Sequence, residues 1–321
     1  MKKMVKLAQG CLLGALVGDA AGARLEFLGR KPTEAELTDA LAMKGGGVLR
    51  VAPGQVTDDG ELTLALARAL EGAPEYPREK VATNYRAWVT SRPFDMGMAT
   101  RAALGGSCLM AGRLADGMSR SAAAHNMPSK ANGALMRASA LGIWATRLSA
   151  EQAARAARED ACLTHPNPSC QWANAAYVVA IRHLLLSLGD AAGALQVARQ
   201  TLQAGTDSEE VQSWLDDAEQ GQLPPAYPQA GFVRIAFSHA FHHLLGGSSY
   251  HQALHQVLSC GGDTDTNACI VGGLVGARVG IDGIPETMVR AVVQCDTAKG
   301  RPRPDWLCAR DALEVAARLL G

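Results

Sequence analysis

Apolar residues recur along most of the chain at the spacing of one face of an α-helix. After Thr57, a residue type that often caps helices, apolar side chains fall at i, i+3, i+4, i+7 and i+8, at Leu62, Ala65, Leu66, Ala69 and Leu70. Alanine is abundant and runs of β-branched residues are few, which favours helices over strands. The best strand candidate, residues 48–51, is short and could equally be a loop. The pattern predicts an all-α protein of roughly a dozen helices.

Besides the helix that follows Thr57, the periodicity predicts helices over residues 5–21, 78–90, 95–106, 132–145, 150–162, 172–188, 190–203, 208–220, 230–245, 248–259, 266–279, 285–294 and 305–320. Turn residues separate these segments, but no loop is long enough to be a domain linker. The composition does not shift along the chain, and no repeat of about 20 to 50 residues is visible. We therefore expect a single compact multi-helix domain over residues 1–321.

Charge and cysteine content narrow the class of protein. The chain has 31 basic and 31 acidic residues, and this balance argues against a nucleic-acid-binding surface. Its eight cysteines form no CxxC pair and fit no zinc motif. The N-terminal apolar run is interrupted by Gly14 and Asp19 and lacks a clear cleavage site, so we interpret it as a helix of the mature protein. No charge-free stretch of about 18 residues predicts a membrane span, and we expect a cytoplasmic protein.

Two short acidic segments, Thr57–Asp59 and Asp263–Thr266, lie far apart in the sequence, and each borders an apolar helical run. Taken alone, the first has a simple structural interpretation, since Thr57 could cap a helix whose dipole the two aspartates complement. The second follows Gly261–Gly262 and leads into a nearly uncharged, glycine-containing helix, which places its carboxylates at the floor of a cleft. If the two segments meet, their four carboxylates need countercharge, and two divalent cations would supply it. An all-oxygen ligand set favours Mg²⁺ or Mn²⁺ over Zn²⁺ or Cu²⁺.

The N-terminal helix carries glycine at every fourth position, at Gly10, Gly14, Gly18 and Gly22. Such a face would be a dimer seam in a membrane, but here it predicts close helix packing in a core. Asp19 lies near the end of this helix and Glu26 lies just beyond it.

These segments together resemble the ADP-ribosylglycohydrolase family, which includes the dinitrogenase-reductase-activating glycohydrolase and the ADP-ribosylarginine hydrolases. The resemblance rests first on GALVGDAAGARLEF (14–27), VTDDGELTLALARAL (56–70) and GGDTDTNACIVGGLVGARVG (261–280). Residues 94–101, 132–137 and 164–166 also agree with segments of the family. The similarity runs in one colinear order from about residue 7 to residue 280, which a single acidic motif could not provide.

The resemblance implies a compact all-α fold with a central binuclear metal cleft and assigns roles to residues of this chain. The implied ligands of the two divalent cations, Mg²⁺ or Mn²⁺, are Thr57, Asp58, Asp59, Asp263, Asp265 and Thr266. The implied catalytic residues are Glu26, Asp59 and Asp95, and the implied substrate-binding residues are Asn132, Gly133, Met136 and His165.

Three features of the sequence, at His165, at Gly60 and at the later histidines, allow an interpretation other than a direct role in the site. A lone histidine before proline is often a helix C-terminal cap, so His165 could be structural. Gly60 departs from the family, whose members usually carry Thr or Ser there, and this puts the tuning of the metals in doubt. The histidines from residue 239 to residue 255 show i,i+4 spacing but no HExxH motif, and we expect them on the surface.

The implied activity is metal-dependent hydrolysis of the N-glycosidic bond between ADP-ribose and a protein side chain, most simply arginine. Within the family, ADP-ribosyl-serine, ADP-ribosylated nucleobases and O-acetyl-ADP-ribose are the alternative substrates. An alternative of another class is an immunity-type protein that blocks an ADP-ribosylating toxin by occlusion. A purely structural homologue is disfavoured because the implied ligand set is complete. The expected partners are an ADP-ribosylated protein, the product ADP-ribose and a candidate ADP-ribosylating enzyme or toxin, with a monomer as the default state.

Overall fold

The structure is a computed structural model that describes residues 2–105 and 113–321. Within these residues the chain forms sixteen α-helices and no strand, apart from two isolated bridges between single residues. The predicted all-α fold is therefore confirmed. The helices are α1 (Lys2–Gly22), α2 (Glu34–Leu41), α3 (Asp58–Leu70), α4 (Arg78–Thr90), α5 (Met98–Leu104), α6 (Leu114–Asn126), α7 (Ser139–Trp144), α8 (Ala150–Ala161), α9 (Pro168–Leu186), α10 (Ala191–Gln203), α11 (Glu209–Glu219), α12 (Val233–Leu245), α13 (Tyr250–Ser259), α14 (Thr264–Val279), α15 (Glu286–Val293) and α16 (Ala312–Arg318).

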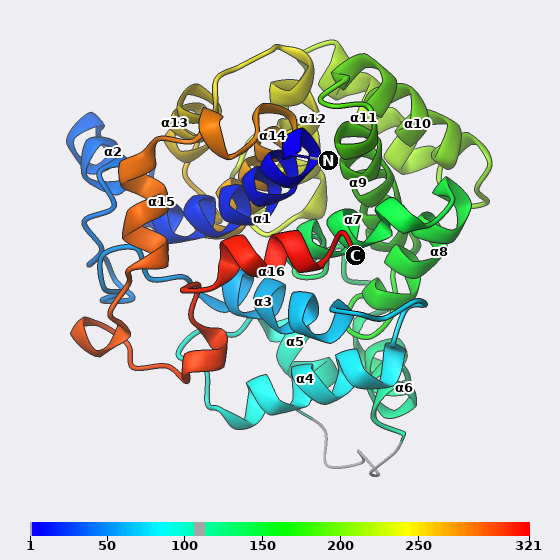
Figure 1. The fold of residues 1–321 in the computed structure, drawn as a ribbon, viewed down its shortest axis with the longest axis horizontal. Coiled ribbons are helices and arrows are strands. Elements are labelled where there is room, and N and C mark those ends of the chain that lie inside the picture. Colours follow the sequence, from blue (N-terminus) through cyan, green and yellow to red (C-terminus); the bar gives the residue numbers. More distant parts are fainter. Residues whose placement is uncertain (1, 106–112) are drawn as a thin grey trace.

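Helices α1 and α14 form the centre of the fold and lie side by side in Figure 1. Their contact is made by backbone on backbone, because the glycine face of α1 meets small residues of α14. A Cβ atom added to Gly14 would lie 2.3 Å from the carbonyl oxygen of Gly272, and one added to Gly18 would lie 2.1 Å from that of Ala268. Tyr250 closes the contact from α13, since its hydroxyl donates to the carbonyl oxygen of Gly14 at 2.6 Å. The predicted core packing of this face is confirmed.

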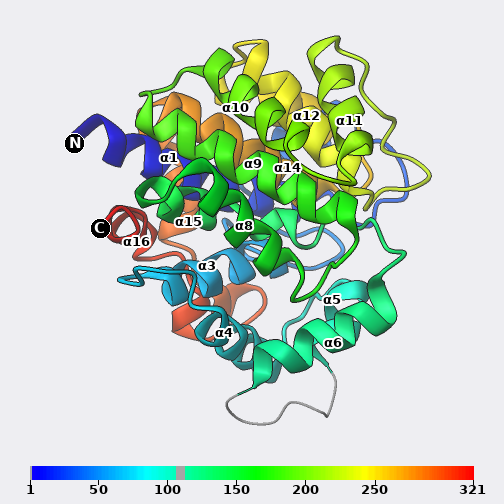
Figure 2. The ribbon, with the colours of Figure 1, turned by 90° about the vertical axis from the view of Figure 1, so that its right-hand side faces the viewer.

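The two helices run in opposite directions along this contact. Gly10, near the start of α1, lies against Gly276 and Gly280 at the end of α14, whereas Gly22 lies against Thr264 and Asp265 at the start of α14. The C-terminal end of α1 is therefore brought to the N-terminal end of α14. The start of α3 approaches the same point, while α16 lies between α1 and α3 (Figure 1 and Figure 2).

Several helix predictions need correction. Helices α2 and α6 were not predicted, although α2 carries a capping box in which Thr33 and Glu36 bond each other's backbone amides. The segment 132–145 is not one helix, because a 3₁₀ turn at Leu135–Arg137 precedes the short α7. Residues 305–320 are likewise divided into a 3₁₀ turn at Asp305–Leu307 and α16.

Shorter differences affect three more segments. Helix α5 covers only part of the predicted 95–106, and residue 106 lies outside the described residues. The strand candidate 48–51 is mainly a turn, closed by mutual backbone hydrogen bonds between Gly46 and Val51. The expectation of surface histidines is wrong for His239 and His243, which are buried on the inner face of α12.

By length and apolar composition α1 could cross a membrane, although Lys6 and Asp19 leave no charge-free run of 18 residues in it. In the fold, however, 78% of its most apolar 18-residue window is buried against other helices. The apolar character of α1 is thus used in packing the core.

The backbone contact between α1 and α14 predicts a sharp response to the smallest possible side chain. We expect Gly18→Ala to lower the free energy of unfolding by about 3 kcal/mol, because the added methyl group forces two helix backbones apart. Gly97→Ala is the matched control, since the nearest atom to its added Cβ is the Thr100 hydroxyl oxygen at 4.0 Å. Urea unfolding followed by circular dichroism measures both variants, and equal losses would contradict the packing argument.

Candidate active site

Carboxylates from three distant segments meet where α1 ends and where α3 and α14 begin. Two groups of three lie close enough to share an ion, with their nearest ligand oxygens within 4.8 Å of one another. The first group is Asp19, Asp59 and Asp265, and the second is Glu26, Asp263 and Asp265. Asp265 belongs to both, so the two groups form one continuous site. The predicted meeting of the two acidic segments is therefore present.

Asp19 is the member of this site to which the sequence analysis gave no role. Its side chain is fully buried and accepts hydrogen bonds from the backbone amides of Thr57 at 2.9 Å and Gly60 at 2.8 Å. It also accepts from the hydroxyl of Thr57 at 2.7 Å. Asp19 thus fixes the N-terminus of α3 to α1 and sets the position of Asp59. A lone acid within an apolar, glycine-rich helix was the signal that could have identified it.

Thr57 is brought to the site, but its side chain does not reach the cleft. Its hydroxyl donates to Asp19 and lies 3.1 Å from Asp59 Oδ2, and it makes no capping bond to the backbone of α3. Thr57 therefore orients the carboxylates of Asp19 and Asp59 from the side that faces away from the cleft.

The contact between Asp19 and the start of α3 explains why residue 60 is glycine. A Cβ atom at this position would lie 2.6 Å from Asp19 Oδ2 and 2.6 Å from the Cβ of Val56. The departure from Thr or Ser therefore lets the backbone of α3 approach Asp19 closely. This position acts through the carboxylate behind the site and does not line the cleft.

The second group of carboxylates is held by the start of α14. Glu26 accepts hydrogen bonds from the amide of Thr264 at 2.7 Å and from its hydroxyl at 3.0 Å. Asp263 occupies the N-cap position of α14 and accepts a hydrogen bond from the Asn132 amide at 2.8 Å. Positive helix N-termini favour carboxylates, so the local folds of α3 and α14 both support this acidic site.

The electrostatics of the site leave its negative charge unbalanced by the protein. Burial raises the pKa of Asp19 and of Glu26 to about 7. Burial first, and neighbouring carboxylates second, raise the pKa of Asp59 and Asp265 well above the usual range. Among the described residues, none of these carboxylates forms an ion pair with a basic side chain, since the buried pairs lie elsewhere.

A divalent cation fits this donor set. Asp59 Oδ1 is buried and has no hydrogen-bond partner, so one carboxylate oxygen remains free for a ligand. All the converging donors are oxygens, which suit Mg²⁺ or Mn²⁺. Asp59, Asp265, Asp263 and Glu26 would hold the ions directly, and Asp19 is the third member of the first group.

A cleft of about 180 Å³ opens above these carboxylates. Every predicted site residue except Thr57 lines it. These residues are Glu26, Asp58, Asp59, Asp95, Asn132, Gly133, Met136, His165, Asp263, Asp265 and Thr266. Two apolar side chains that the sequence analysis missed stand at the rim, Phe27 with 59% of its surface exposed and Met98 with 89%. An acidic floor and an apolar rim suit a ligand with both a polar sugar and an apolar face.

His165 contributes a neutral ring to the wall of the cleft. Burial, and then the charge of Arg137, lowers its pKa to about 3. Its Nδ1 atom pairs with the Thr164 hydroxyl at 2.8 Å, and its Cε1 atom would be 2.9 Å from a Cβ at Gly133. The imidazole lies in the cleft wall and does not cap α8, whose C-cap residue is Cys162.

Asp95 reaches the cleft from the loop between α4 and α5. It is half-buried, and burial raises its pKa. The same loop returns to the acidic floor, because the amide of Gly97 points to Asp58 Oδ2 at 3.4 Å. The negative charge of Asp95 in turn helps to raise the pKa of Asp58, after burial. The loop therefore couples a carboxylate at the mouth of the cleft to one at its floor.

Comparison with known proteins gives this geometry a family. The family model described as ADP-ribosylglycohydrolase matches residues 3–320. The chain belongs to the ADP-ribosylglycohydrolase family. It is accordingly a hydrolase of this family, and the family's metal dependence agrees with the two carboxylate groups.

Three similar proteins extend over most of the chain. A protein of Acanthamoeba polyphaga mimivirus that carries the ADP-ribosyl glycohydrolase name is 29% identical, over 93% of this chain and 94% of its own length. The ADP-ribosyl-dinitrogen-reductase glycohydrolase of Rhodospirillum rubrum is 27% identical over 87% of each chain. The ADP-ribosylarginine hydrolase Tri1 of Pseudomonas putida is 28% identical over 89% of this chain and 74% of its own. A solved structure described as an ADP-ribosylglycohydrolase-related protein complex superposes with a TM-score of 0.77 at 25% identity, covering 100% of this chain and 99% of that one.

The position of Asp19 predicts a role in metal binding. We expect Asp19→Asn to weaken Mn²⁺ binding by roughly 10- to 100-fold, because the amide removes a charge and turns a donor toward the amides of Thr57 and Gly60. Calorimetric titration of the metal-free protein measures the affinity. Asp39→Asn is the control, since Asp39 pairs with Arg24 and Lys44 at the surface. Unchanged Mn²⁺ affinity in Asp19→Asn would remove this residue from the metal site.

The raised pKa values predict how stability depends on pH without metal. The folded protein holds protons on Asp19 and Glu26 up to about pH 7, whereas the unfolded chain loses them near 3.8 and 4.5. The free energy of unfolding should therefore fall as pH rises between about 4 and 7 and level off above that window. Added Mn²⁺ should oppose the fall, since it binds the ionised carboxylates. Urea unfolding at a series of pH values in EDTA measures this slope, and a stability that rises through the window would contradict it.

Proposed function

We propose that this protein removes ADP-ribose from the arginine side chains of modified proteins by hydrolysing the N-glycosidic bond. The observation that carries the proposal is the position of Asp95, a carboxylate at the mouth of an acidic cleft. The names of two relatives support it, since one is an ADP-ribosylarginine hydrolase and another acts on ADP-ribosyl-dinitrogen reductase. Both relatives match most of this chain, at 27% and 28% identity.

The ribose that carries the scissile bond would lie on the acidic floor, and Mg²⁺ or Mn²⁺ would occupy the two carboxylate groups. Bound divalent cations supply two things, a grip on neighbouring hydroxyls and activation of water near neutral pH. Glu26 and Asp59 stand on the floor, where negative charge stabilises an oxocarbenium-like state. Asn132, Gly133, Met136 and His165 line the wall that would hold the rest of the ADP-ribose.

The arginine leaving group accounts for Asp95. A carboxylate binds a guanidinium group through paired, charge-assisted hydrogen bonds, which fix its orientation. Burial raises the pKa of Asp95, and a guanidinium partner would oppose that shift by favouring the ionised carboxylate, which is the form that makes this pair. This role requires the side chain to lie at the mouth of the cleft, beyond the carboxylates that would hold the ions.

The proposed partners are an ADP-ribosylated protein and the released ADP-ribose. The exposed apolar side chains of Phe27 and Met98 at the rim suit contact with a protein surface or with a planar base. The seven described cysteines are free, which supports the proposal of a reducing compartment such as the cytoplasm.

A panel of defined substrates tests the proposal, and it contains ADP-ribosyl-arginine, ADP-ribosyl-serine, ADP-ribosylated nucleobases and O-acetyl-ADP-ribose. We expect ADP-ribosyl-arginine to be preferred and Asp95→Asn to lower kcat on it by about 100-fold, since the carboxylate that orients the guanidinium is lost. Asp116→Asn, at an exposed position of α6, is the matched control.

Asp265→Ala adds a second arm, because it removes the carboxylate common to both metal groups and should abolish hydrolysis of every substrate. Unchanged kcat and KM in Asp95→Asn would exclude Asp95 from the reaction. Protection against an ADP-ribosylating toxin that survives in Asp265→Ala would indicate occlusion instead of catalysis.

A further inference from the structure

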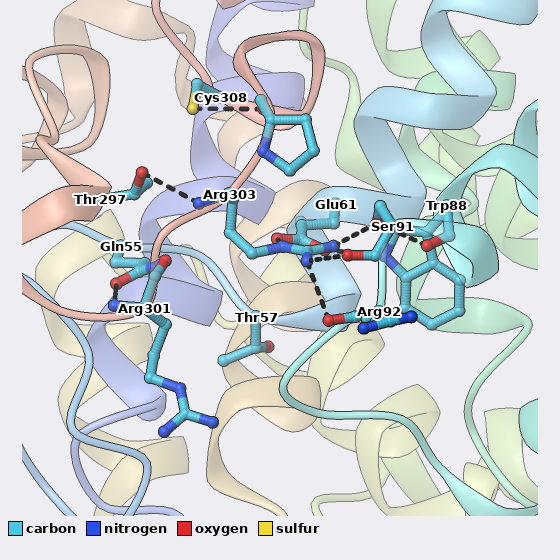
Figure 3. Close-up of polar contacts among 12 residues, drawn as sticks. Gln55, Thr57, Glu61, Trp88, Ser91, Arg92, Thr297, Arg301, Arg303 and Cys308 are labelled. Atoms are coloured by element: carbon cyan, nitrogen blue, oxygen red, sulfur yellow. Dashed lines mark hydrogen bonds and ion pairs between the residues drawn. The ribbon is translucent and has the colours of Figure 1, made fainter.

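The segment between α15 (Glu286–Val293) and α16 (Ala312–Arg318) lies against α3 and the end of α4, although it follows the last of the acidic motifs in the sequence. Figure 3 shows this segment where it passes Gln55, Glu61 and the end of α4. The backbone at Gly300 packs directly on Ala52, since an added Cβ would lie 2.1 Å from the amide nitrogen of Ala52. The amide of Arg301 donates to the Gln55 side chain at 2.9 Å. The segment is therefore fixed on the side that precedes α3.

Arg303 extends from this segment into a buried polar site and uses every donor of its guanidinium group. Its Nε and Nη2 atoms donate to the two carboxylate oxygens of Glu61 at 2.6 and 2.9 Å. Its Nη1 atom donates to the backbone carbonyls of Ser91 at 2.9 Å and Arg92 at 3.1 Å, and Nη2 also donates to the Ser91 hydroxyl at 2.6 Å. Trp88 completes the site, since its indole nitrogen donates to Glu61 at 2.7 Å.

These contacts join the two elements that carry Asp58 and Asp95. Glu61 lies on α3 three residues after Asp58, which places it one helical turn further along. Ser91 is the C-cap residue of α4, and the loop that begins there leads through Arg92 to Asp95. One guanidinium group thus fixes the start of this loop relative to the helix that bears the acidic floor (Figure 3).

The backbone of Arg92 shows that the start of the loop is constrained. Its φ angle is +56°, in the left-handed region that residues other than glycine seldom occupy. Such a conformation persists where surrounding contacts hold it, and the carbonyl oxygen of Arg92 is held by Arg303. Further along the loop, the guanidinium of Arg301 lies 5.3 Å from the ring centre of Phe94, the residue before Asp95. The same C-terminal segment therefore holds the loop at two places.

A second arginine pair, Arg68 with Asp311, also attaches the C-terminal region to α3 and serves as a comparison for Arg303. Arg68, at the far end of α3, donates to both carboxylate oxygens of Asp311 at 2.6 and 2.9 Å and to the carbonyl of Trp306 at 2.8 Å. It joins the same helix to the same C-terminal region, yet it has no contact with the loop that leads to Asp95. The Arg303–Glu61 pair is also the more deeply buried of the two, with side chains only 4% and 2% exposed.

We propose that Arg303, with Glu61, is a positioning residue that sets the distance between Asp95 at the mouth of the cleft and Asp58 at its floor. The proposal rests on the proposed function only for the consequence in catalysis. A lysine cannot replace Arg303, because one ammonium group cannot bond a carboxylate in two places and two carbonyls on the opposite side. The C-terminal segment thereby becomes part of the machinery that aligns the leaving group.

Steady-state kinetics on ADP-ribosyl-arginine test the consequence in catalysis. We expect Arg303→Gln and Arg303→Lys to lower kcat by about 10- to 100-fold with a much smaller change in KM, because misplacing a catalytic group acts mainly on the reacting complex. Arg68→Gln, the matched control, should leave kcat within about threefold, whatever it does to thermal stability. In an Asp95→Asn background, Arg303→Gln should have little further effect, since both changes remove one function.

Hydrogen–deuterium exchange of the full-length protein tests the positioning without any substrate. We expect Arg303→Gln to speed amide exchange in residues 92–97 by about tenfold or more while leaving α14 unchanged, and Arg68→Gln to leave residues 92–97 unchanged. Equal exchange in the loop of Arg303→Gln and the wild type would overturn the proposal. Faster exchange with full activity would overturn it as well, since position would then be irrelevant to catalysis. Absence of hydrolysis by the wild-type protein would contradict the proposed function alone, because the exchange result stands independently.

Discussion

The repulsion among carboxylates buried without cationic partners is the constraint around which this molecule is built. Asp19, Asp59 and Asp265 lie within bonding range of a common ion, and burial raises the pKa of each. Without a cation, carboxylates buried so close together tend to take up protons or to move apart. The surrounding structure must therefore hold them rigidly in place. The backbone contact of α1 with α14, and the bonds from Asp19 to α3, provide that rigidity. The same closeness of carboxylates that favours metal binding therefore lowers the free energy of unfolding of the metal-free protein.

The parts of the site that could be predicted were those in which local sequence carries chemistry. The two acidic segments, the glycine face of α1 and the loops around Asn132 and His165 each show a pattern within a few residues. Their convergence was implied by the resemblance to the family, and charge then predicted that buried carboxylates brought together need divalent cations. The all-α class followed from apolar periodicity, which the long helices express clearly.

What could not be predicted depends on contacts between residues distant in the chain. The sequence marks Asp19 as an unusual acid in an apolar helix, but it does not reveal its partner, the amide of Gly60, 41 residues away. The Glu61–Arg303 pair joins residues separated by 242 positions, and neither residue is part of a local motif. The burial of His239 and His243 likewise depends on which face of α12 turns inward, and that choice is made by the neighbouring helices. Helix periodicity alone gives no information about such long-range partners.

The central helix contact also has a consequence for how the chain reaches its native state. α1 is made well before its partner α14, which begins at Thr264, more than 240 residues after the end of α1. Until that partner emerges, the apolar glycine face of α1 has no backbone against which to pack. Contacts of such large sequence separation slow folding, because a long loop must close before they form. Between the synthesis of α1 and that of α14, the growing chain therefore exposes an apolar helix that can associate with other apolar segments.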